Sequence, residues 1–250
     1  MVPRRAMSRS PTAWAIRFTS PIPYDRGVAF MEALHAARVA DEIPDTLLLL
    51  QHTPVVTLGR RGRDGHLLCT AEALAARGIA LRVAGRGGDA TYHGPGQWVL
   101  YPIIRLGGAV ADAHSYLWRL EEVAIRTAGA FGVVAYRRAG MSGAWTDAGK
   151  IAAIGFYIRR WVTLHGMSFN VAPDMSGFET IVPCGLVGEK VASLATILGR
   201  SPPLDAVGHG LLEQAEVVLA RSVQVFEESE PWPEALRRRW EGSQDRGSAL

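Results

Sequence analysis

Apolar residues in this chain recur with two spacings, one typical of helices and the other of strands. Val28, Met31 and Leu34 are three residues apart, which places them on one face of a helix. The four leucines at 47–50 form a short apolar run of the kind found in buried strands. We therefore expect helices at 24–39, 70–78, 112–131 and 205–222. The expected strands are 14–18, 47–50, 55–59, 79–84, 98–104, 133–136, 144–146, 150–158 and 161–171.

The order of these elements predicts the fold class. Strands and hairpins are interrupted by a few helices, without regular alternation of strand and helix. Such an order favours an α+β fold, with a mixed, mostly antiparallel sheet packed against helices. No repeat and no Pro-, Gly- or Ser-rich linker divides the 250 residues. We expect one domain over 13–226, a disordered lead-in at 1–12 and a flexible charged tail at 227–250.

Composition narrows the class of protein. The chain is 48% hydrophobic and 20% charged, which is ordinary for a globular protein. No apolar run approaches the roughly 20 residues that span a bilayer, and the basic N-terminus lacks the apolar core of a signal peptide. The expected location is therefore cytoplasmic, with no membrane association. The net charge of +3 is scattered rather than gathered into a basic stripe with aromatics, so we expect no nucleic-acid partner.

The glycine-rich stretch 86–97 is the first candidate for a binding site. Its glycines allow a ligand or another backbone to come close, and a strand-like run follows at once. The alternative is a glycine-rich hairpin with solvated polar groups. The clustered polar and aromatic side chains favour the first interpretation, in which this stretch forms one wall of a ligand-binding site. Its small or rigid residues are Gly87, Gly88, Gly94, Pro95 and Gly96, and its hydrogen-bonding residues are Arg86, Thr91, Tyr92, His93 and Gln97.

Cys184 and Lys150 are the candidate reactive groups. Pro183 and Gly185 flank Cys184, which leaves its sulfur sterically open. A thiol needs a nearby base or cation to become a nucleophile at neutral pH, and a lysine buried in an apolar strand can serve as one. The alternatives are a structural cysteine and a hairpin lysine pointing into water. With only one other cysteine, Cys69, we expect free thiols, and Cys69 to fill the core.

Two further segments could line a slot. Ala153 and Gly155 are small residues on the strand that Lys150 opens, and 165–170 places Gly166 between polar residues on another strand. His165 could support a site there, although a histidine on a strand can equally be a satisfied core residue.

Taken together, these segments resemble the octanoyltransferase family of lipoate biosynthesis, also called lipoate–protein ligase B. The resemblance rests on 86–97, 149–155, 165–170 and 183–185, and 52–60 supports it upstream. Similarity runs from about residue 24 to residue 222, in the order of the family. The fold that it implies is the one shared by biotin and lipoate protein ligases.

The resemblance also implies an activity and its partners. Such an enzyme transfers an octanoyl group from acyl carrier protein to a lysine of lipoyl domains, in 2-oxoacid dehydrogenase complexes and the glycine cleavage H protein. It needs no cofactor or metal, because the acyl group arrives on the phosphopantetheine of the carrier. Cys184 matches the family's acyl-thioester cysteine and Lys150 the lysine that lowers its pKa. The matching substrate-contacting residues are Arg86, Gly87, Gly88, Asp89, Ala90, Thr91, Tyr92, His93, Ala153, Ile154, Gly155, Gly166, Met167 and Ser168, with His165 and Gln97 in support.

Thioester chemistry makes this activity reasonable without ATP. A thioester donor and an enzyme thioester are close in free energy, and amide formation makes the second step favourable. We expect backbone N–H groups near Cys184 and the side chain of His93 to stabilise the oxyanion. The alternatives are an ATP-dependent lipoate or biotin ligase, a cysteine hydrolase and a non-catalytic module that binds a carrier protein.

Overall fold

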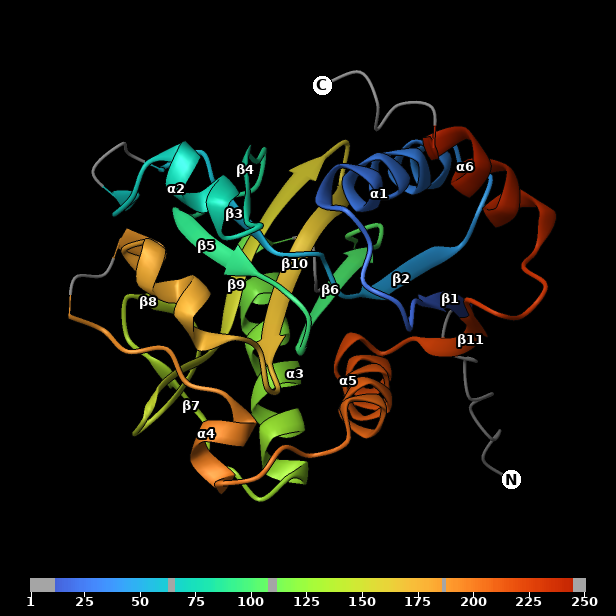
Figure 1. Cartoon of the computed structure of the whole chain (residues 1–250). Coiled ribbons are helices and arrows are strands. Elements are labelled where there is room, and N and C mark those ends of the chain that lie inside the picture. Colours follow the sequence, from blue (N-terminus) through green and yellow to red (C-terminus); the bar gives the residue numbers. More distant parts are fainter. Residues whose placement is uncertain (1–11, 63–65, 108–111, 186–187, 245–250) are drawn as a thin grey trace, which may run out of the picture.

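The computed structural model describes residues 12–62, 66–107, 112–185 and 188–244, and it contains two β-sheets (Figure 1). The large sheet has the strand order β11-β1-β2-β6-β10-β9-β8-β7, and the small sheet the order β4-β3-β5. β1 runs parallel to β2 and β11, and β3 runs parallel to β4; the other pairs are antiparallel. The predicted α+β fold with a mixed sheet is confirmed. The strands are β1 Thr12–Arg17, β2 Asp45–Leu50, β3 Val55–Leu58, β4 Ala80–Val83, β5 Ala90–His93, β6 Gln97–Ile103, β7 Tyr136–Arg138, β8 Met141–Thr146, β9 Gly149–Arg159, β10 Val162–Asn170 and β11 Ser222–Glu227.

Helices cover both faces of the large sheet (Figure 1). Side chains alternate between the two faces of a strand, so Leu47 and Leu49 of β2 join one core cluster while Leu48 and Leu50 join another. The first cluster lies under α3 and α5, and the second lies under α1 and α6. The helices are α1 Tyr24–Val39, α2 Ala71–Ala76, α3 Ala113–Ala130, α4 Leu194–Leu198, α5 Leu204–Leu219 and α6 Glu234–Gln244, with 3-10 helices η3 Met175–Thr180 and η4 Pro183–Gly185.

The helix predictions with clear boundary signals are confirmed. α1 has the predicted bounds. Thr70 caps α2 by accepting a hydrogen bond from the Ala73 N–H, and Asp112 caps α3 through the His114 and Ser115 N–H groups. These side chains satisfy backbone donors that a helix leaves unpaired at its N-terminus. Among the described helices, none combines the length and apolar composition that a membrane crossing requires.

Strand β5 was not predicted, and two boundary predictions are wrong. β5 lies within the stretch 86–97, and it pairs with β3 and so draws its stability from a distant segment. The strand expected at 133–136 begins only at Tyr136, because Val133 instead follows the end of α3 and packs in the core. The last long helix ends at Leu219 rather than at 222. Ser222 starts β11, which pairs with β1 at the sheet edge.

The prediction of a flexible tail from 227 fails for residues 234–244, which fold as α6. Leu236 is fully buried against the cluster under α1, and Trp232 and Trp240 pack around Phe18 and Phe30. These aromatic contacts hold a helix whose sequence is otherwise strongly charged. Residues 1–11 of the lead-in predicted at 1–12 lie outside the described residues, and Thr12 belongs to β1, so the predicted boundary is one residue too late.

Replacing Leu236 by alanine tests whether α6 belongs to the folded domain. Because Leu236 is buried in the cluster, we expect Leu236→Ala to lower the free energy of unfolding by about 2–4 kcal/mol. Arg237→Ala, at an exposed position of the same helix, is the control and should change it by less than about 0.5 kcal/mol. Urea unfolding of both variants measures the difference, and equal stability would show that α6 does not pack as described.

Candidate active site

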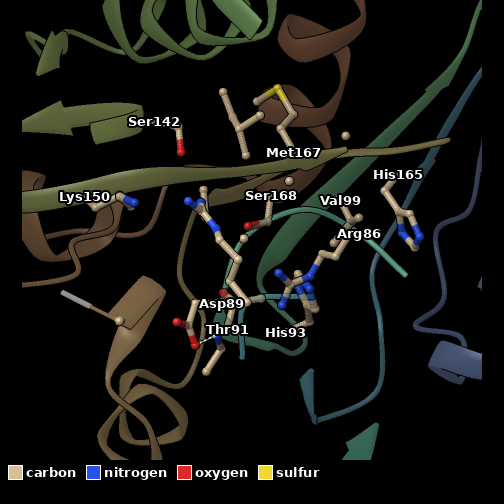
Figure 2. A pocket seen from close by; sticks show the side chains of 18 of the residues that line it. Arg86, Asp89, Thr91, His93, Val99, Ser142, Lys150, His165, Met167 and Ser168 are labelled. Atoms are coloured by element: carbon tan, nitrogen blue, oxygen red, sulfur yellow. Dashed lines mark hydrogen bonds between the residues drawn. The ribbon is translucent and has the colours of Figure 1, made fainter. Parts of the chain in front are cut away.

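A cavity of about 350 Å³ lies where β5 of the small sheet faces β6, β9 and β10 of the large sheet. Its size is within the range of pockets that bind small molecules. Figure 2 shows Lys150 and Ser142 towards one end and His165 towards the other, with Met167 and Ser168 between them. Most residues predicted from sequence to contact substrate line this cavity. They are Arg86, Gly88, Asp89, Ala90, Thr91, His93, Ala153, Ile154, Gly155, Gly166, Met167 and Ser168, together with Lys150 and His165.

Among the predicted site residues whose side chains the structure describes, three do not line the cavity. Tyr92 lies on the opposite face of β5 from Thr91 and His93, and its ring packs against Phe178 with the centroids 5.3 Å apart. Gly87 lies behind the cavity wall, where its N–H donates to the Phe156 carbonyl. Gln97 acts through His93, as described below. The predicted direct contacts of Tyr92 and Gly87 with substrate are therefore not supported by their positions, whereas Gln97 was predicted only to support the site, and it bonds to His93, which lines the cavity.

The glycines at 87 and 155 allow two chain segments to touch. A Cβ atom on Gly155 would lie 2.5 Å from the Gly87 carbonyl oxygen, which is closer than real Cβ atoms approach. The Arg86 guanidinium fixes the same region from the other side, donating to the Thr57 carbonyl and hydroxyl at 2.8 and 2.6 Å. The small sheet and β9 are thereby joined along the side of the cavity.

Buried histidines at the cavity are held neutral. Desolvation, helped by nearby His52, lowers the pKa of His93 to about 3, and desolvation with the Arg86 charge lowers that of His165 to about 3. Desolvation also lowers the pKa of His52 to about 4. A neutral imidazole has one donor and one acceptor nitrogen, so the partners of each ring decide what it can do.

The hydrogen bonds of Gln97 correct the role predicted for His93. Gln97 Nε2 donates to the Tyr92 carbonyl and to Asn170 Oδ1, so Gln97 Oε1 accepts from His93 Nδ1 at 2.6 Å. The neutral His93 ring then carries its proton on Nδ1, and Nε2 is an acceptor. His93 therefore cannot donate a hydrogen bond to an oxyanion from Nε2, contrary to the prediction.

His165 is not the satisfied core histidine that the sequence allowed. Only 5% of its surface is exposed, yet Nδ1 has no hydrogen-bond partner among the described residues. Its backbone φ of +57° is unusual for a side chain with a Cβ atom, and more so within a strand. A buried, strained and incompletely paired residue at a cavity wall is typical of a functional position.

Lys150 points into the cavity rather than into water. It is 5% exposed, and its Nζ lies 4.7 Å from the centroid of the Trp145 ring. The Lys150 N–H donates to the Lys190 carbonyl and its own carbonyl accepts from Ala192, so the backbone is fixed on both sides. The alternative of a solvated hairpin lysine is therefore wrong.

The backbone of Cys184 lies in η4, and its side chain lies outside the described residues. Gly185 lines the same cavity as Lys150, so the fold brings the two predicted reactive segments together. A pair that the sequence did not reveal lies beside η4: His66 Nδ1 and Asp89 Oδ2 are 2.8 Å apart. A Cβ atom on Gly185 would lie 2.7 Å from Asp89 Oδ2 and 3.0 Å from His66 Cε1.

Backbone pairing explains how His66 reaches this place. Leu68 N–H donates to the Thr180 carbonyl, and Val182 N–H donates to the His66 carbonyl. The segment 66–68 thus lies along 180–182, directly before Cys184. Other cavity residues that the sequence did not identify come from separate elements, and their neighbours carry no signal for them. They are Tyr24, Arg61, Val99, Tyr101, Gly140, Met141 and Ser142.

Comparison with known proteins establishes the family. Residues 23–216 match the lipoyl protein ligase A/B catalytic domain. The octanoyltransferase of Geobacter metallireducens is 43% identical over 218 residues, covering 87% of this chain and 99% of the relative. The octanoyltransferase of Chloroflexus aurantiacus is 42% identical over 213 residues, covering 84% of this chain and 96% of the relative. The chain therefore belongs to the lipoyl protein ligase A/B catalytic domain family. Within that family it belongs with the octanoyltransferases, which confirms the resemblance seen in the sequence.

Solved structures agree on the fold. Lipoate-protein ligase A bound with ATP superposes with a TM-score of 0.74 at 15% identity, covering 96% of this chain and 97% of the ligase. A bi-partite lipoate protein ligase of Thermoplasma acidophilum superposes with a TM-score of 0.71 at 16% identity, covering 94% and 92%. At such low identity these likenesses establish the architecture alone. The predicted lipoate ligase fold is confirmed.

Proposed function

We propose that the chain is an acyltransferase that moves an octanoyl group from acyl carrier protein to a specific lysine of lipoyl domains, through a thioester on Cys184. This is the first step of endogenous protein lipoylation. The observation that carries the proposal is the meeting of Lys150, on β9, with Gly185, which follows Cys184, in one cavity. Identity above 40% with octanoyltransferases over most of the chain supports the substrate class.

The first half-reaction loads the enzyme. Lys150 serves as the base that takes the Cys184 thiol proton, and the thiolate attacks the carbonyl carbon of octanoyl phosphopantetheine. The new C–S bond forms as the phosphopantetheine sulfur leaves, and that thiolate recovers the proton from the Lys150 ammonium. One thioester replaces another, so the step needs no ATP and no cofactor. The partly enclosed cavity then holds the acyl chain away from water.

The second half-reaction forms the amide. The ammonium of the acceptor lysine loses one proton to water, and the neutral amine attacks the Cys184 thioester. The C–S bond breaks, and the second amine proton passes through Lys150 to the Cys184 thiolate. Backbone N–H groups near Cys184 are the donors that we propose for the oxyanion, because the bonded tautomer removes His93 from this role.

The His66–Asp89 pair is proposed to hold the loop that carries Cys184. The two side chains touch the position of Gly185, and the backbone of His66 pairs with Val182. A nucleophile must be held close to its productive geometry, and neighbouring side chains commonly supply that support.

Transfer to a purified apo lipoyl domain tests the proposal. We expect the domain to gain one octanoyl group when incubated with the enzyme and octanoyl carrier protein, in the absence of ATP and metal ions. Intact-mass measurement of the domain is the readout, and a domain with its target lysine replaced by arginine is the control. A strict ATP requirement would indicate a ligase, and free octanoate without an acceptor would indicate a hydrolase. Binding of the carrier protein with no acyl transfer at all would indicate a binding module.

A further inference from the structure

Lys150 reaches the cavity because the strand that carries it is irregular. Ala152 belongs to the core cluster under α3 and α5, and Phe156 packs against that cluster. Side chains of a regular strand alternate between two faces, so Lys150 would be expected to face the same cluster. It lines the cavity instead, together with Ala153 and Gly155. An interruption between Lys150 and Ala152 must therefore turn the lysine from one face of the sheet to the other.

The interruption is a β-bulge at Ile151. Ala144 of β8 pairs with Ala152, but the next residue of β8, Trp145, pairs with Lys150. One step along β8 thus matches two steps along β9, and Ile151 is the extra residue. Ile151 is fully buried in the same core cluster as Ala152, so two successive side chains share one face. The bulge accounts for the direction of Lys150, and a group that fixes the bulge also positions the lysine.

Gly143 allows β8 to lie close against this bulge. A Cβ atom on Gly143 would collide with the Ala152 carbonyl oxygen and would lie 3.4 Å from Lys150 Cε. The φ of Gly143 is +116°, in the region that glycine adopts and other residues rarely do. The backbone of Gly143 is therefore the part of β8 that contacts both the bulged segment and the stem of the lysine.

A buried carboxylate from α3 holds Gly143. Glu121 is 7% exposed, and its Oε1 accepts a hydrogen bond from the Gly143 N–H at 3.1 Å. Its Oε2 accepts from Arg137 Nε at 3.1 Å. A carboxylate this deeply buried is costly unless such partners compensate its charge. The next residue, Glu122, also accepts from Arg137, at 2.7 Å. Of these two described carboxylates, Glu121 is the one that bonds to β8.

We propose that Glu121 is a positioning residue for the base: by binding the Gly143 N–H, it fixes the bulge that turns Lys150 into the cavity. The inference rests on the proposed function, because it takes Lys150 as the group that activates Cys184. Glu121 is not among the residues that line the cavity, so it acts through Gly143 and Lys150 and not on the substrate.

The substitution Glu121→Ala tests this role, because it removes the partner of the Gly143 N–H. A displacement of about 1 Å at a reacting group can slow a reaction by about 100-fold. We expect kcat for octanoyl transfer to fall about 10- to 100-fold, while KM for octanoyl carrier protein stays within about twofold of the wild type. The matched control is Glu122→Ala, which also removes a partner of Arg137 but no contact with β8. Its kcat should stay within about twofold of the wild type.

The pH dependence of Cys184 alkylation separates positioning from charge. The midpoint for iodoacetamide, read from Cys184 peptides, should rise in Glu121→Ala as in Lys150→Ala, because the thiolate loses the lysine that favours it. Loss of the Glu121 charge alone would favour the thiolate and lower the midpoint. Glu121→Gln keeps an oxygen that can accept from Gly143 and should not raise the midpoint. Glu121→Asp keeps the charge but is about 1.5 Å shorter, so it should raise the midpoint even if the alanine variant does not fold.

The outcomes separate this inference from the proposed function. If Lys150→Ala raises the midpoint and neither Glu121→Ala nor Glu121→Asp does, the positioning role is overturned. Equal slowing of transfer by Glu121→Ala in the wild-type and Lys150→Ala backgrounds would also overturn it, because positioning acts only through the lysine. An unchanged midpoint in Lys150→Ala itself would contradict the proposed function. Hydrogen exchange at the Gly143 amide needs no turnover: it should be slow in the wild type and faster in Glu121→Ala, and fast exchange in the folded wild type would overturn the inference.

Discussion

Replacing Cys184 by alanine is expected to reduce octanoyl transfer by about 10,000-fold or more, because the variant has no thiol to form the thioester. Alanine is smaller than cysteine and fits a turn without strain, so the folded structure should be retained. The initial rate of lipoyl-domain octanoylation, followed by intact mass, measures the loss. Transfer within tenfold of the wild-type rate would mean that the acyl group passes directly from the carrier to the acceptor.

Cys69 provides the matched control. It is the other cysteine of the chain, and it packs with the apolar residues under the small sheet, where its sulfur is 3.9 Å from the Thr180 carbonyl oxygen. Cys69→Ala should therefore lower stability slightly and leave the transfer rate within about twofold of the wild type. If Cys69→Ala instead abolished transfer, the nucleophile would have been assigned to the wrong thiol.

Replacing Lys150 by alanine is expected to slow transfer by about 100- to 10,000-fold, which is the usual contribution of a general acid–base group. The proposed reason is that Lys150 takes the thiol proton and returns it to the leaving group. Without the lysine, the thiolate of Cys184 should form only at higher pH. The rate of alkylation by iodoacetamide against pH measures this directly, and its midpoint should move upward in Lys150→Ala.

Lys190 is the control for this change. It is the second of the two lysines in the chain, and its side chain is exposed. Lys190→Ala should leave both the transfer rate and the alkylation profile near those of the wild type. An unchanged alkylation profile in Lys150→Ala would remove Lys150 from the activation of the thiol, whatever the effect on turnover.

Local sequence signals predicted much of the fold. α1 could be bounded because its apolar residues repeat along one face, and Thr70 and Asp112 cap their helices as their side-chain chemistry suggests. β5 could not be predicted from the local sequence, because its four residues are stabilised by pairing with β3, more than thirty residues away, and are surrounded by glycines. α6 was missed because three arginines dominate its sequence, while its stability comes from Leu236 and aromatic residues that pack on α1.

The residues of the cavity also differ in how far the sequence could identify them. The stretch 86–97 and Lys150 could be identified because unusual residue types are clustered there. Tyr24 and Tyr101 could not, since each lies in an ordinary element and reaches the cavity only through the tertiary fold. The pairing of His66 with Asp89 depends on backbone hydrogen bonds between 66–68 and 180–182. No residue pattern in the sequence indicates that these two distant segments lie side by side.

Trapping the acyl enzyme is the most direct test of the central claim, that the octanoyl group passes through Cys184. The wild-type chain is incubated with octanoyl carrier protein and no acceptor, and its peptides are then mapped by mass spectrometry. We predict one octanoyl group per chain, on Cys184, which disappears when an apo lipoyl domain is added. An adduct on another residue, or no adduct while transfer to the lipoyl domain proceeds, would contradict the account.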